Sequence, residues 1–445
     1  MKKYRFPALI LTLLLALSLL TAPAAALDDP APLAQAAILV DGVYGDVLYE
    51  HNGYEKMYPA SITKIMTSLL VLEAIERGEL SLTTQVAASA ASVAMPEDSS
   101  NVGIKPGEIL TVEQLLYCDL VASANEACNI LAETVGGTIP DFVDLMNAKA
   151  AELGMTGTHF TNPHGLHNES HYTTAYDITL MARAAMEHEL FRTIVSTASY
   201  TVPATNMSKE RNLHSTNALI SNWYYLSYLY NKALGIKTGT TNAAGKCLAS
   251  AASDGEGRTY YCVILGAQPA QREDGTAIQT QFSESKRLLE WAFDSFERRV
   301  LLDDTSYINE IPVTLSDEAE HVVVQPRGSI EATMPVDYDP DKAVITVELP
   351  DQVEAPVEQG QVLGSISLSY DGVDYGSLEL VTADRVARSD FQFYLKITQA
   401  YFSQWWVKTL IAAAVLLSFF LIVRRVLFRP RRYSSSGSSY RGKRR

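Results

Sequence analysis

The chain carries an apolar segment near each end, and this pair of segments constrains where the residues between them can fold. The first apolar segment, residues 8–20, follows three basic residues and precedes the small residues 24–26. A basic start, a short apolar run and a small-residue cleavage site are together typical of a secretory signal peptide. We therefore expect residues 1–26 to be a signal peptide, with an uncleaved signal anchor as the alternative.

The second apolar segment, residues 405–425, has the length that one helical passage through a bilayer needs, about 20 residues. Two tryptophans open the segment, and the basic tail 426–445 follows it, as is typical of a cytoplasmic end. We expect a transmembrane helix here. An amphipathic helix lying in the interface is the alternative, but residues 411–420 are apolar around the whole helix apart from Ser418.

Charge is distributed unevenly along the chain. The formal net charge is −15, and all 51 acidic residues lie between the two apolar segments. Residues 424–445, in contrast, contain nine basic residues and no acidic one. The acidic middle argues against nucleic acid and anionic membranes as its partners. The tail suits anionic lipid headgroups, so we expect an extracytoplasmic middle and a cytoplasmic tail.

The order of the expected elements between the apolar ends favours an α/β (α+β) fold, a sheet with helices packed against it. Alternating apolar residues predict a hairpin over 36–51. Periodic apolar positions then predict a long helical block, three strands and a final helix. The helices are expected at 61–77, 111–120, 124–135, 139–153, 174–187 and 277–296, and the strands at 233–240, 245–252 and 258–267.

The composition changes after Glu297, where short β-branched alternations separated by Gly, Pro and Asp turns predict a small all-β domain. We place the first domain at 27–297, the all-β domain at 298–385 and a linker at 386–404.

The four cysteines are expected to be free, buried thiols. Cys118 and Cys128 fall in expected helices, whereas Cys247 and Cys262 lie nearly symmetrically about the turn at 254–257 and could therefore face each other. Directly paired cross-strand cysteines strain a disulfide. No CxxC or other metal-ligand spacing occurs.

Three short motifs carry the chemistry. In the first, Ser61 and Lys64 stand three residues apart at the start of an apolar helix. This spacing places the lysine on the serine's face of the helix, one turn deeper. A buried lysine can lose its proton and activate a serine that attacks a carbonyl. Taken alone, the pair also fits a capping serine with a surface lysine.

The other two motifs are Ser123-Ala124-Asn125 between two helices and Lys237-Thr238-Gly239 on a strand. A hydroxyl and an amide on a tight turn can relay a proton and hold a peptide carbonyl. A lysine and a threonine at a strand edge can bind a terminal carboxylate, and glycine lets a substrate strand approach. Alone, each motif also fits an ordinary turn or a polar strand end.

In this order, the three motifs form the S-x-x-K, S-x-N and K-T-G set of penicillin-binding proteins and serine β-lactamases. The chain resembles a low-molecular-weight penicillin-binding protein of the D-alanyl-D-alanine carboxypeptidase type (peptidase family S11). The segments 59–64, 161–166 and 235–240 carry this resemblance, which covers roughly residues 33–385. It implies a transpeptidase-like fold and hydrolysis of D-Ala-D-Ala stem peptides of bacterial peptidoglycan through an acyl-enzyme. It also implies β-lactams as covalent inhibitors and anchoring to the plasma membrane.

The resemblance also implies a role for each motif residue. Ser61 is the nucleophile and Lys64 its base, while Ser123 and Asn125 support proton transfer and substrate binding. The remaining residues form the substrate-binding strand: Lys237, Thr238, Gly239 and Thr240. The backbone N–H groups of Ser61 and Thr240 would form the oxyanion hole. Some relatives use additional arginines to bind the substrate. In this chain, only Arg211 and Arg258 are candidates for that role.

No cofactor or metal is expected. Four histidines, at 159, 164, 167 and 171, cluster in the sequence and could bind zinc. The intervening residues break any helical i, i+4 pairing of ligands, and the resemblance makes this segment a structural loop.

Three other functions remain open at the sequence level. A serine β-lactamase would share the acyl-enzyme but needs a glutamate-held water, for which residues 126–236 show no clear motif. A D,D-endopeptidase would use the same residues as the carboxypeptidase. A non-catalytic wall-binding protein is disfavoured by the intact Ser61 and Lys64.

Overall fold

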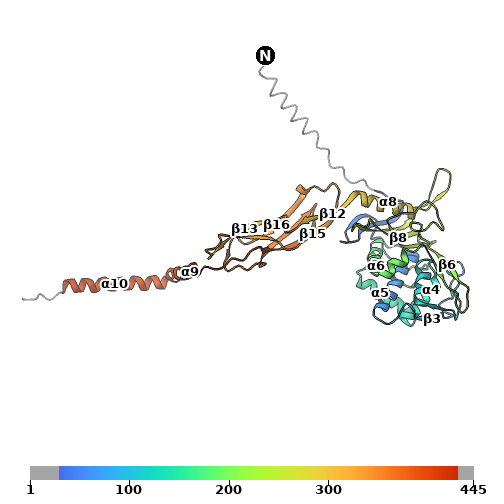
Figure 1. Cartoon of the computed structure of the whole chain (residues 1–445), viewed down its shortest axis with the longest axis horizontal. Coiled ribbons are helices and arrows are strands. Elements are labelled where there is room, and N and C mark those ends of the chain that lie inside the picture. The colour runs from blue at the N-terminus through green and yellow to red at the C-terminus, as the bar shows by residue number, and fades with distance from the viewer. Residues whose placement is uncertain (1–29, 429–445) are drawn as a thin grey trace, which may run out of the picture. The chain divides into compact units, whose positions relative to one another are not determined.

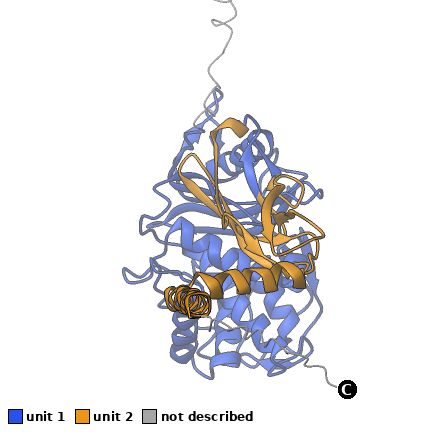
Figure 2. Ribbon diagram, turned by 90° about the vertical axis from the view of Figure 1, so that its left-hand side faces the viewer, with its two compact units in different colours: residues 1–299, 332–338 blue, residues 300–331, 339–445 orange. Residues whose placement is uncertain are grey.

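The computed structural model describes residues 30–428, so the expected signal peptide and most of the basic tail lie outside the described residues. The chain divides into two compact units, which Figure 2 shows in different colours. The first unit comprises residues 1–299 and 332–338, and the second comprises residues 300–331 and 339–445.

The first unit is built on a five-stranded antiparallel sheet with the strand order β2-β1-β9-β8-β7. The two N-terminal strands therefore share one sheet with three strands that follow about 180 residues later, and β1 pairs with β9. The strands are β1 (Ala34–Asp41), β2 (Val47–His51), β7 (Ala233–Thr241), β8 (Gly245–Ser253) and β9 (Thr259–Ala267).

Each face of this sheet packs against a separate apolar core, because side chains alternate along a strand. In β1, Ile38 and Val40 belong to the larger core, whereas Ala37 and Leu39 belong to the smaller one. Helix α8 (Thr280–Ser295) covers the smaller core, and the helical block that includes α4, α5 and α6 lies on the other side of the sheet (Figure 1).

The helical block begins with a 3-10 turn, η1 (Ala60–Thr63), that continues directly into α2 (Lys64–Glu76). Threonine side chains cap α3, α5 and α6 by accepting backbone N–H groups. The further helices are α3 (Val112–Leu120), α4 (Asn125–Gly136), α5 (Ile139–Glu152), α6 (Ala175–Glu187) and α7 (Glu189–Val195). Short strand pairs complete the unit: β3 (Gln85–Ala87) with β4 (Ile109–Thr111), β5 (Ser199–Val202) with β6 (Arg211–His214), and β10 (Ala270–Gln271) with β11 (Ala277–Ile278).

The second unit contains a six-stranded sheet with the order β16-β18-β19-β14-β13-β17. Its strands are β13 (Asn309–Thr314), β14 (His321–Pro326), β16 (Ala343–Glu348), β17 (Val353–Glu354), β18 (Val362–Tyr370) and β19 (Val373–Thr382). Strand β12 (Phe296–Leu302) pairs with β15 (Ile330–Pro335), and a 3-10 turn, η2, spans Pro340–Lys342.

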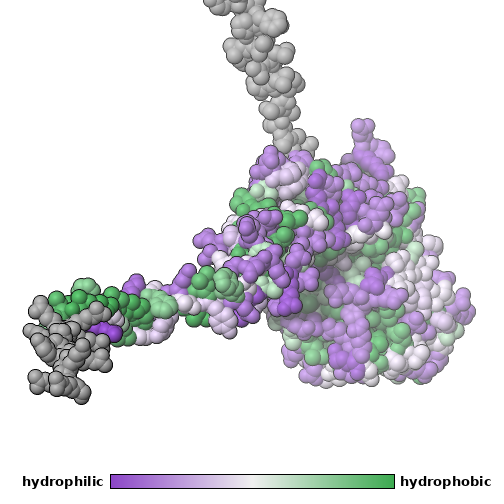
Figure 3. Space-filling model, turned by 60° about the vertical axis from the view of Figure 1, so that its left-hand side comes forward, coloured by the Kyte–Doolittle hydropathy of each residue, from purple (hydrophilic) through white to green (hydrophobic). Residues whose placement is uncertain are grey.

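Two helices follow this sheet. Helix α9 (Asp390–Ser403) occupies most of the segment expected to be a linker, and the Ser389 side chain caps it. Helix α10 (Trp405–Leu427) has 23 residues and contains an 18-residue stretch with a mean hydropathy of 2.3, which makes it long and apolar enough to cross a membrane. Figure 3 shows hydrophobic residues exposed along it. The mixed α/β unit, the C-terminal β sheet and the apolar helix confirm the predicted fold class.

The expected placement of two cysteines is wrong, although all four are free and buried as predicted. Cys262 of β9 pairs with Ser250 of β8, whereas Cys247 pairs with Gly239 of β7. The hairpin closes with Ser253 opposite Thr259, so its centre lies farther along the chain than the symmetry of the two cysteines suggests.

Candidate active site

The three motifs, distant in sequence, meet around the start of α2. The Lys64 Nζ atom lies 3.0 Å from Ser61 Oγ and 2.6 Å from Asn125 Oδ1. The Lys237 Nζ atom lies 2.9 Å from Ser123 Oγ. Both amines are almost completely buried. The fold therefore brings all three motifs into one hydrogen-bonded cluster.

Ser61 lies within the 3-10 turn η1, and Lys64 is the first residue of α2. No side chain caps either element, and Lys64 is 0% exposed. The alternative of a capping serine with a surface lysine is therefore excluded. The preceding residue, Ala60, has a positive φ of 48°, an uncommon conformation for a residue with a side chain that clusters at functional sites.

The second motif lies in the tight connection between α3 and α4. Ser123 has a φ of 62°, and Asn125 begins α4. The Ala124 N–H donates to the Cys118 carbonyl across this turn at 2.9 Å. The turn thus directs the Ser123 hydroxyl toward β7 and the Asn125 amide toward α2.

The third motif lies on β7, which ends the sheet order and so has an edge that no other named strand pairs with. Thr238 and Thr240 line the pocket in front of Ser61, and Thr238 Oγ1 lies 2.5 Å from Thr216 Oγ1. Gly239 faces η1: a Cβ atom there would lie only 2.8 Å from the Pro59 carbonyl oxygen. Close packing of η1 against β7 is therefore a further reason for glycine, besides the substrate approach expected from the sequence.

The loop after α5 completes the surroundings of Lys64. The His164 carbonyl oxygen lies 2.9 Å from Lys64 Nζ. Asn162 orders this loop, because its Oδ1 accepts the Gly165 N–H at 2.7 Å and its Nδ2 donates to the Leu166 carbonyl at 2.9 Å. Gly165 has a φ of +85°, and a Cβ there would come within 1.9 Å of the Ala60 carbonyl oxygen.

Three of the clustered histidines, at 159, 164 and 171, form hydrogen bonds in this loop, and His167 packs edge-on against Tyr58. His171 Nδ1 accepts the Thr161 N–H at 3.0 Å, which leaves Nε2–H to donate to Thr63 Oγ1 at 2.8 Å. Burial lowers the pKa of His171 to about 4, and burial followed by the charge of Lys64 lowers that of His164 to about 3. Within residues 30–428, no group of three His, Cys, Asp or Glu residues could hold a metal ion.

Two buried lysine amines, which have no ion-pair partner in the described part of the chain, distinguish the site from ordinary buried polar clusters. Burial, and secondarily the charge of Lys64, lower the pKa of Lys237 to about 7. Among the described residues, neither lysine forms an ion pair within 4.0 Å. Their partners are hydroxyls, an amide and backbone carbonyls instead.

A pocket of about 390 Å³ opens onto Ser61, Ser123, Thr238 and Thr240. Several residues that line this pocket were not predicted from the sequence: Ser100, Asn101, Thr216, Tyr224, Tyr225 and Gln281. The aromatic run at 223–225 was the available signal in the sequence. The Gln281 Oε1 atom is buried without a hydrogen-bond partner.

The two arginines considered as substrate ligands do not line this pocket. Arg211 Nη2 bonds to both carboxylate oxygens of Glu108, at 2.7 and 2.8 Å. Arg258 pairs with Asp254 and donates to the carbonyls of Phe293 and Phe296. Both guanidinium groups therefore hold the fold together.

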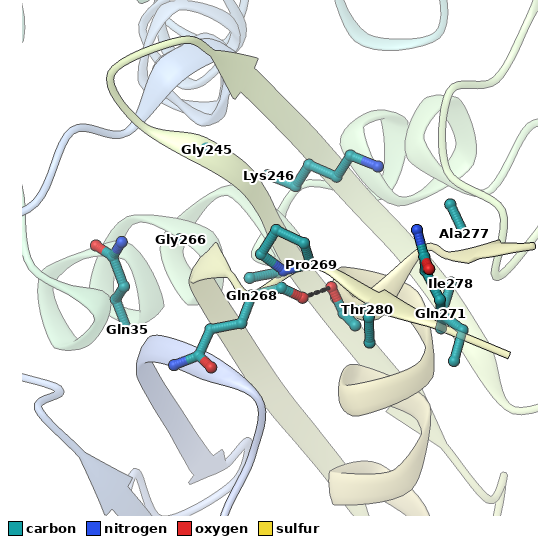
Figure 4. Close-up of a pocket in the computed structure, with 12 residues that line it drawn as sticks. Gln35, Gly245, Lys246, Gly266, Gln268, Pro269, Gln271, Ala277, Ile278 and Thr280 are labelled. Atoms are coloured by element: carbon teal, nitrogen blue, oxygen red, sulfur yellow. Dashed lines mark hydrogen bonds between the residues drawn. The ribbon is translucent and has the colours of Figure 1, made fainter. Parts of the chain in front are cut away.

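A larger pocket of about 680 Å³ lies at the ends of β8 and β9 and includes Gln35, Lys246 and Thr280 (Figure 4). The Thr280 hydroxyl donates to the Gln268 carbonyl at 2.7 Å. The described residues that line this pocket include no carboxylate and no histidine, so it has no catalytic group comparable to the Ser61 cluster.

A serine hydroxyl beside a buried lysine amine, on a helix packed against an antiparallel sheet, defines a hydrolase with a lysine-activated serine. Residues 24–269 match the D-alanyl-D-alanine carboxypeptidase family, peptidase S11. Residues 296–388 match the C-terminal domain of penicillin-binding protein 5. The chain belongs to this S11 family of D-alanyl-D-alanine carboxypeptidases, as the resemblance predicted.

Individual relatives match over most of their length. The D-alanyl-D-alanine carboxypeptidase DacF of Bacillus subtilis is 30% identical over 398 residues, which cover 88% of this chain and 97% of the relative. The D-alanyl-D-alanine carboxypeptidase DacC of Escherichia coli is 32% identical over 384 residues, which cover 82% of this chain and 87% of the relative. Among solved structures, penicillin-binding protein 5 from Haemophilus influenzae matches with 28% sequence identity and a TM-score of 0.62. The match covers 82% of this chain and 100% of the other.

Replacing Gly165 with alanine should disrupt the site through the loop behind Lys64. The new Cβ would clash with the Ala60 carbonyl and displace both Ser61 and the His164 carbonyl. We expect the rate of acylation by a fluorescent penicillin to fall by about tenfold or more, since misplacements near 1 Å can cost about 100-fold. Gly154→Ala is the control, because Gly154 also has a positive φ but meets nothing within 4 Å. Equal acylation rates in the two variants would contradict this prediction.

Proposed function

We propose that the chain removes the terminal D-alanine from peptidoglycan stem peptides through an acyl-enzyme on Ser61. The observation that carries the proposal is the environment of Lys64 Nζ, which lies within 3.0 Å of the Ser61 hydroxyl, the Asn125 carbonyl oxygen and the His164 carbonyl oxygen.

Lys64 Nζ can donate in all three contacts, and the same arrangement also accommodates a neutral amine. Two of the neighbours, Asn125 Oδ1 and the His164 carbonyl oxygen, can only accept hydrogen bonds. They take both N–H hydrogens of a neutral Lys64, whose lone pair then accepts the Ser61 hydroxyl. Lys64 is thus oriented as a general base.

In the first half-reaction, Lys64 takes the hydroxyl proton as Ser61 Oγ attacks the carbonyl carbon of the penultimate D-alanine. The backbone N–H groups of Ser61 and Thr240 stabilise the resulting oxyanion. The C–N bond then breaks, and the leaving amine of the terminal D-alanine receives a proton relayed through Ser123. Water attacks the acyl-enzyme in the second half-reaction, which restores Ser61 and releases the shortened peptide.

Lys237 and Thr238 are assigned to the substrate carboxylate. The Lys237 ammonium has three N–H groups, of which two are used by Ser123 Oγ and the Thr238 carbonyl. One N–H therefore remains for a substrate oxygen. Gly239 and Thr240 continue the same strand edge, along which an extended peptide can lie.

The domain organisation belongs to the same proposal. Residues 1–26 direct export, residues 27–297 carry the chemistry, and residues 298–385 form the β domain. The linker 386–404 leads to a transmembrane helix at 405–425. The tail 426–445 is placed in the cytoplasm and the catalytic unit outside the plasma membrane, because the tail is basic.

The alternatives are weaker on the same observations. A β-lactamase needs a carboxylate-held water for deacylation, and the described residues lining the pocket include no carboxylate. A non-catalytic protein would not need an amine oriented toward the serine. An endopeptidase shares every contact, and free D-alanine release separates it from a carboxypeptidase.

Replacing Ser61 with alanine should abolish D-alanine release from a pentapeptide, by about 10⁴-fold or more, because the attacking atom is removed. Covalent labelling by a fluorescent penicillin should disappear as well. Ser81→Ala, which removes an exposed serine hydroxyl, is the control and should retain both activities. Rapid nitrocefin turnover without D-alanine release by the unmodified protein would favour the β-lactamase instead.

The affinity for substrate should fall as the pH rises through about 7. Lys237 is protonated below its lowered pKa and loses its charge above it, so the carboxylate loses its partner on the alkaline side. We expect kcat/KM, which reports the free enzyme, to decrease by up to about tenfold per pH unit there. A guanidinium stays charged, so Lys237→Arg should lose this decrease. The same alkaline decrease in Lys237→Arg would contradict the assignment.

The full chain should resist extraction from membranes by alkaline carbonate. A helix that spans the bilayer is retained, whereas a helix lying in the interface is released. A chain that ends at Gln404, before α10, should appear in the supernatant. Release of the full chain by carbonate would identify α10 as an interfacial helix.

A further inference from the structure

A buried carboxyl group lies beneath the catalytic cluster and takes no part in the proposed reaction. Asp119, near the end of α3, is 0% exposed. Its Oδ2 accepts the Ser68 hydroxyl at 2.8 Å, and its Oδ1 accepts the Cys128 thiol at 2.7 Å. Both oxygens act as acceptors, which is the pattern of an ionised carboxylate.

The contacts between α2 and α4 form two successive layers. Lys64 and Ser68 are four residues apart on α2, and Asn125 and Cys128 are three residues apart on α4, so each pair shares a helix face. The upper layer is the contact of Lys64 with Asn125. The lower layer is the contact of Ser68 and Cys128 with Asp119, which therefore lies about one helical turn below Lys64.

We propose that Asp119 is a positioning residue whose negative charge compensates the two buried lysines and thereby sets the pH at which Ser61 becomes reactive. This proposal rests on the proposed function, because it assigns Asp119 to the base of that reaction. Two like charges buried together are unfavourable without a counter-charge. Asp119 supplies this counter-charge without forming an ion pair that would hold Lys64 away from the serine.

The electrostatic neighbours of Asp119 come from three elements. They are Lys64 of α2, Lys237 of β7 and Cys128 of α4. Burial raises the pKa of Asp119, and the positive charge of Lys64 is the largest opposing influence. Conversely, the charge of Asp119 opposes the lowering of the Lys237 pKa by burial and by Lys64.

Other charged and ionisable groups also lie near α3: Glu126, Arg211 and Glu108 act on Cys118. Burial keeps Cys128 protonated by raising its pKa well above the ordinary value, and burial raises that of Cys118, on α3 itself, to about 12. The ionisable residues of α7, Glu189 and Arg192, are exposed, and β4 has no ionisable side chain. Among these carboxyl groups, Asp119 is the one that interacts electrostatically with both lysines.

The test is the pH dependence of acylation of the full chain by a fluorescent penicillin. Asp119→Asn keeps the shape of the side chain and removes the negative charge that acts on the two buried lysines, which destabilises a protonated amine in the cluster. Unit charges about 6 Å apart, at an effective dielectric constant of about 20, displace a titration midpoint by about two pH units. We expect the acid limb of the profile to move down by about one to two pH units.

Two further variants make the test decisive. Asp144→Asn removes the same charge from an exposed position on α5 and should leave the profile unchanged. Ser68→Ala removes one hydrogen-bond donor from the carboxylate, so its profile should move in the same direction as that of Asp119→Asn, but less. This variant decides the question if Asp119→Asn does not fold.

The outcomes separate the two proposals. Absence of both acylation and D-alanine release in the unmodified protein overturns the proposed function. An active unmodified protein whose profile superimposes on that of Asp119→Asn, or on that of Ser68→Ala if the first variant does not fold, overturns the role of Asp119. A shift toward alkaline pH would also contradict it, because loss of a negative charge can only destabilise protonated lysines.

Discussion

The site depends on the burial of one amine, that of Lys64. A buried amine is unfavourable unless its hydrogen-bonding groups are satisfied, and its three partners come from three separate segments. The helical start at Ser61, the turn before Asn125 and the loop at His164 must therefore all be in place together. This requirement explains why the packing around Ala60 is so close that neither Gly165 nor Gly239 has room for a side chain.

The two buried lysines need opposite protonation states at the same pH. Lys64 acts when it is neutral, whereas Lys237 binds a carboxylate when it is charged. Their surroundings differ accordingly: two carbonyl oxygens and a hydroxyl surround Lys64, whereas Lys237 keeps one N–H beyond its bonds to Ser123 Oγ and a single carbonyl. Pairs of titratable groups whose environments separate their protonation states are a common basis of acid–base catalysis. A carboxylate one turn below, Asp119, compensates positive charge on these amines without forming an ion pair with either.

The sequence was sufficient to predict the longer elements of the first unit and the motif residues, because both depend on local patterns, but not the short strands β3–β6, β10 and β11 or the helices α7 and α9. The apolar residues of β1 and of α2 are buried on nearly all sides, and the fold class followed from the order of such segments. The pairing of Cys262 was not predictable, since it depends on where the β8–β9 hairpin closes. Asp119 was missed because an acidic residue in an apolar helix carries no local signal of its partners. Gln281 and Tyr225 line the pocket only through long-range packing.

The position of β7 at the end of the sheet connects the fold to the proposed reaction. An exposed strand edge is a hazard, because its unpaired backbone groups can bind other chains. Here the edge strand also carries Lys237 and Thr238, and Thr240 lines the pocket beside Ser61. An extended peptide that pairs with this edge would place its terminal carboxylate and its reacting carbonyl at fixed positions along one strand. Covering the edge with a sixth strand would therefore remove the substrate site while stabilising the sheet.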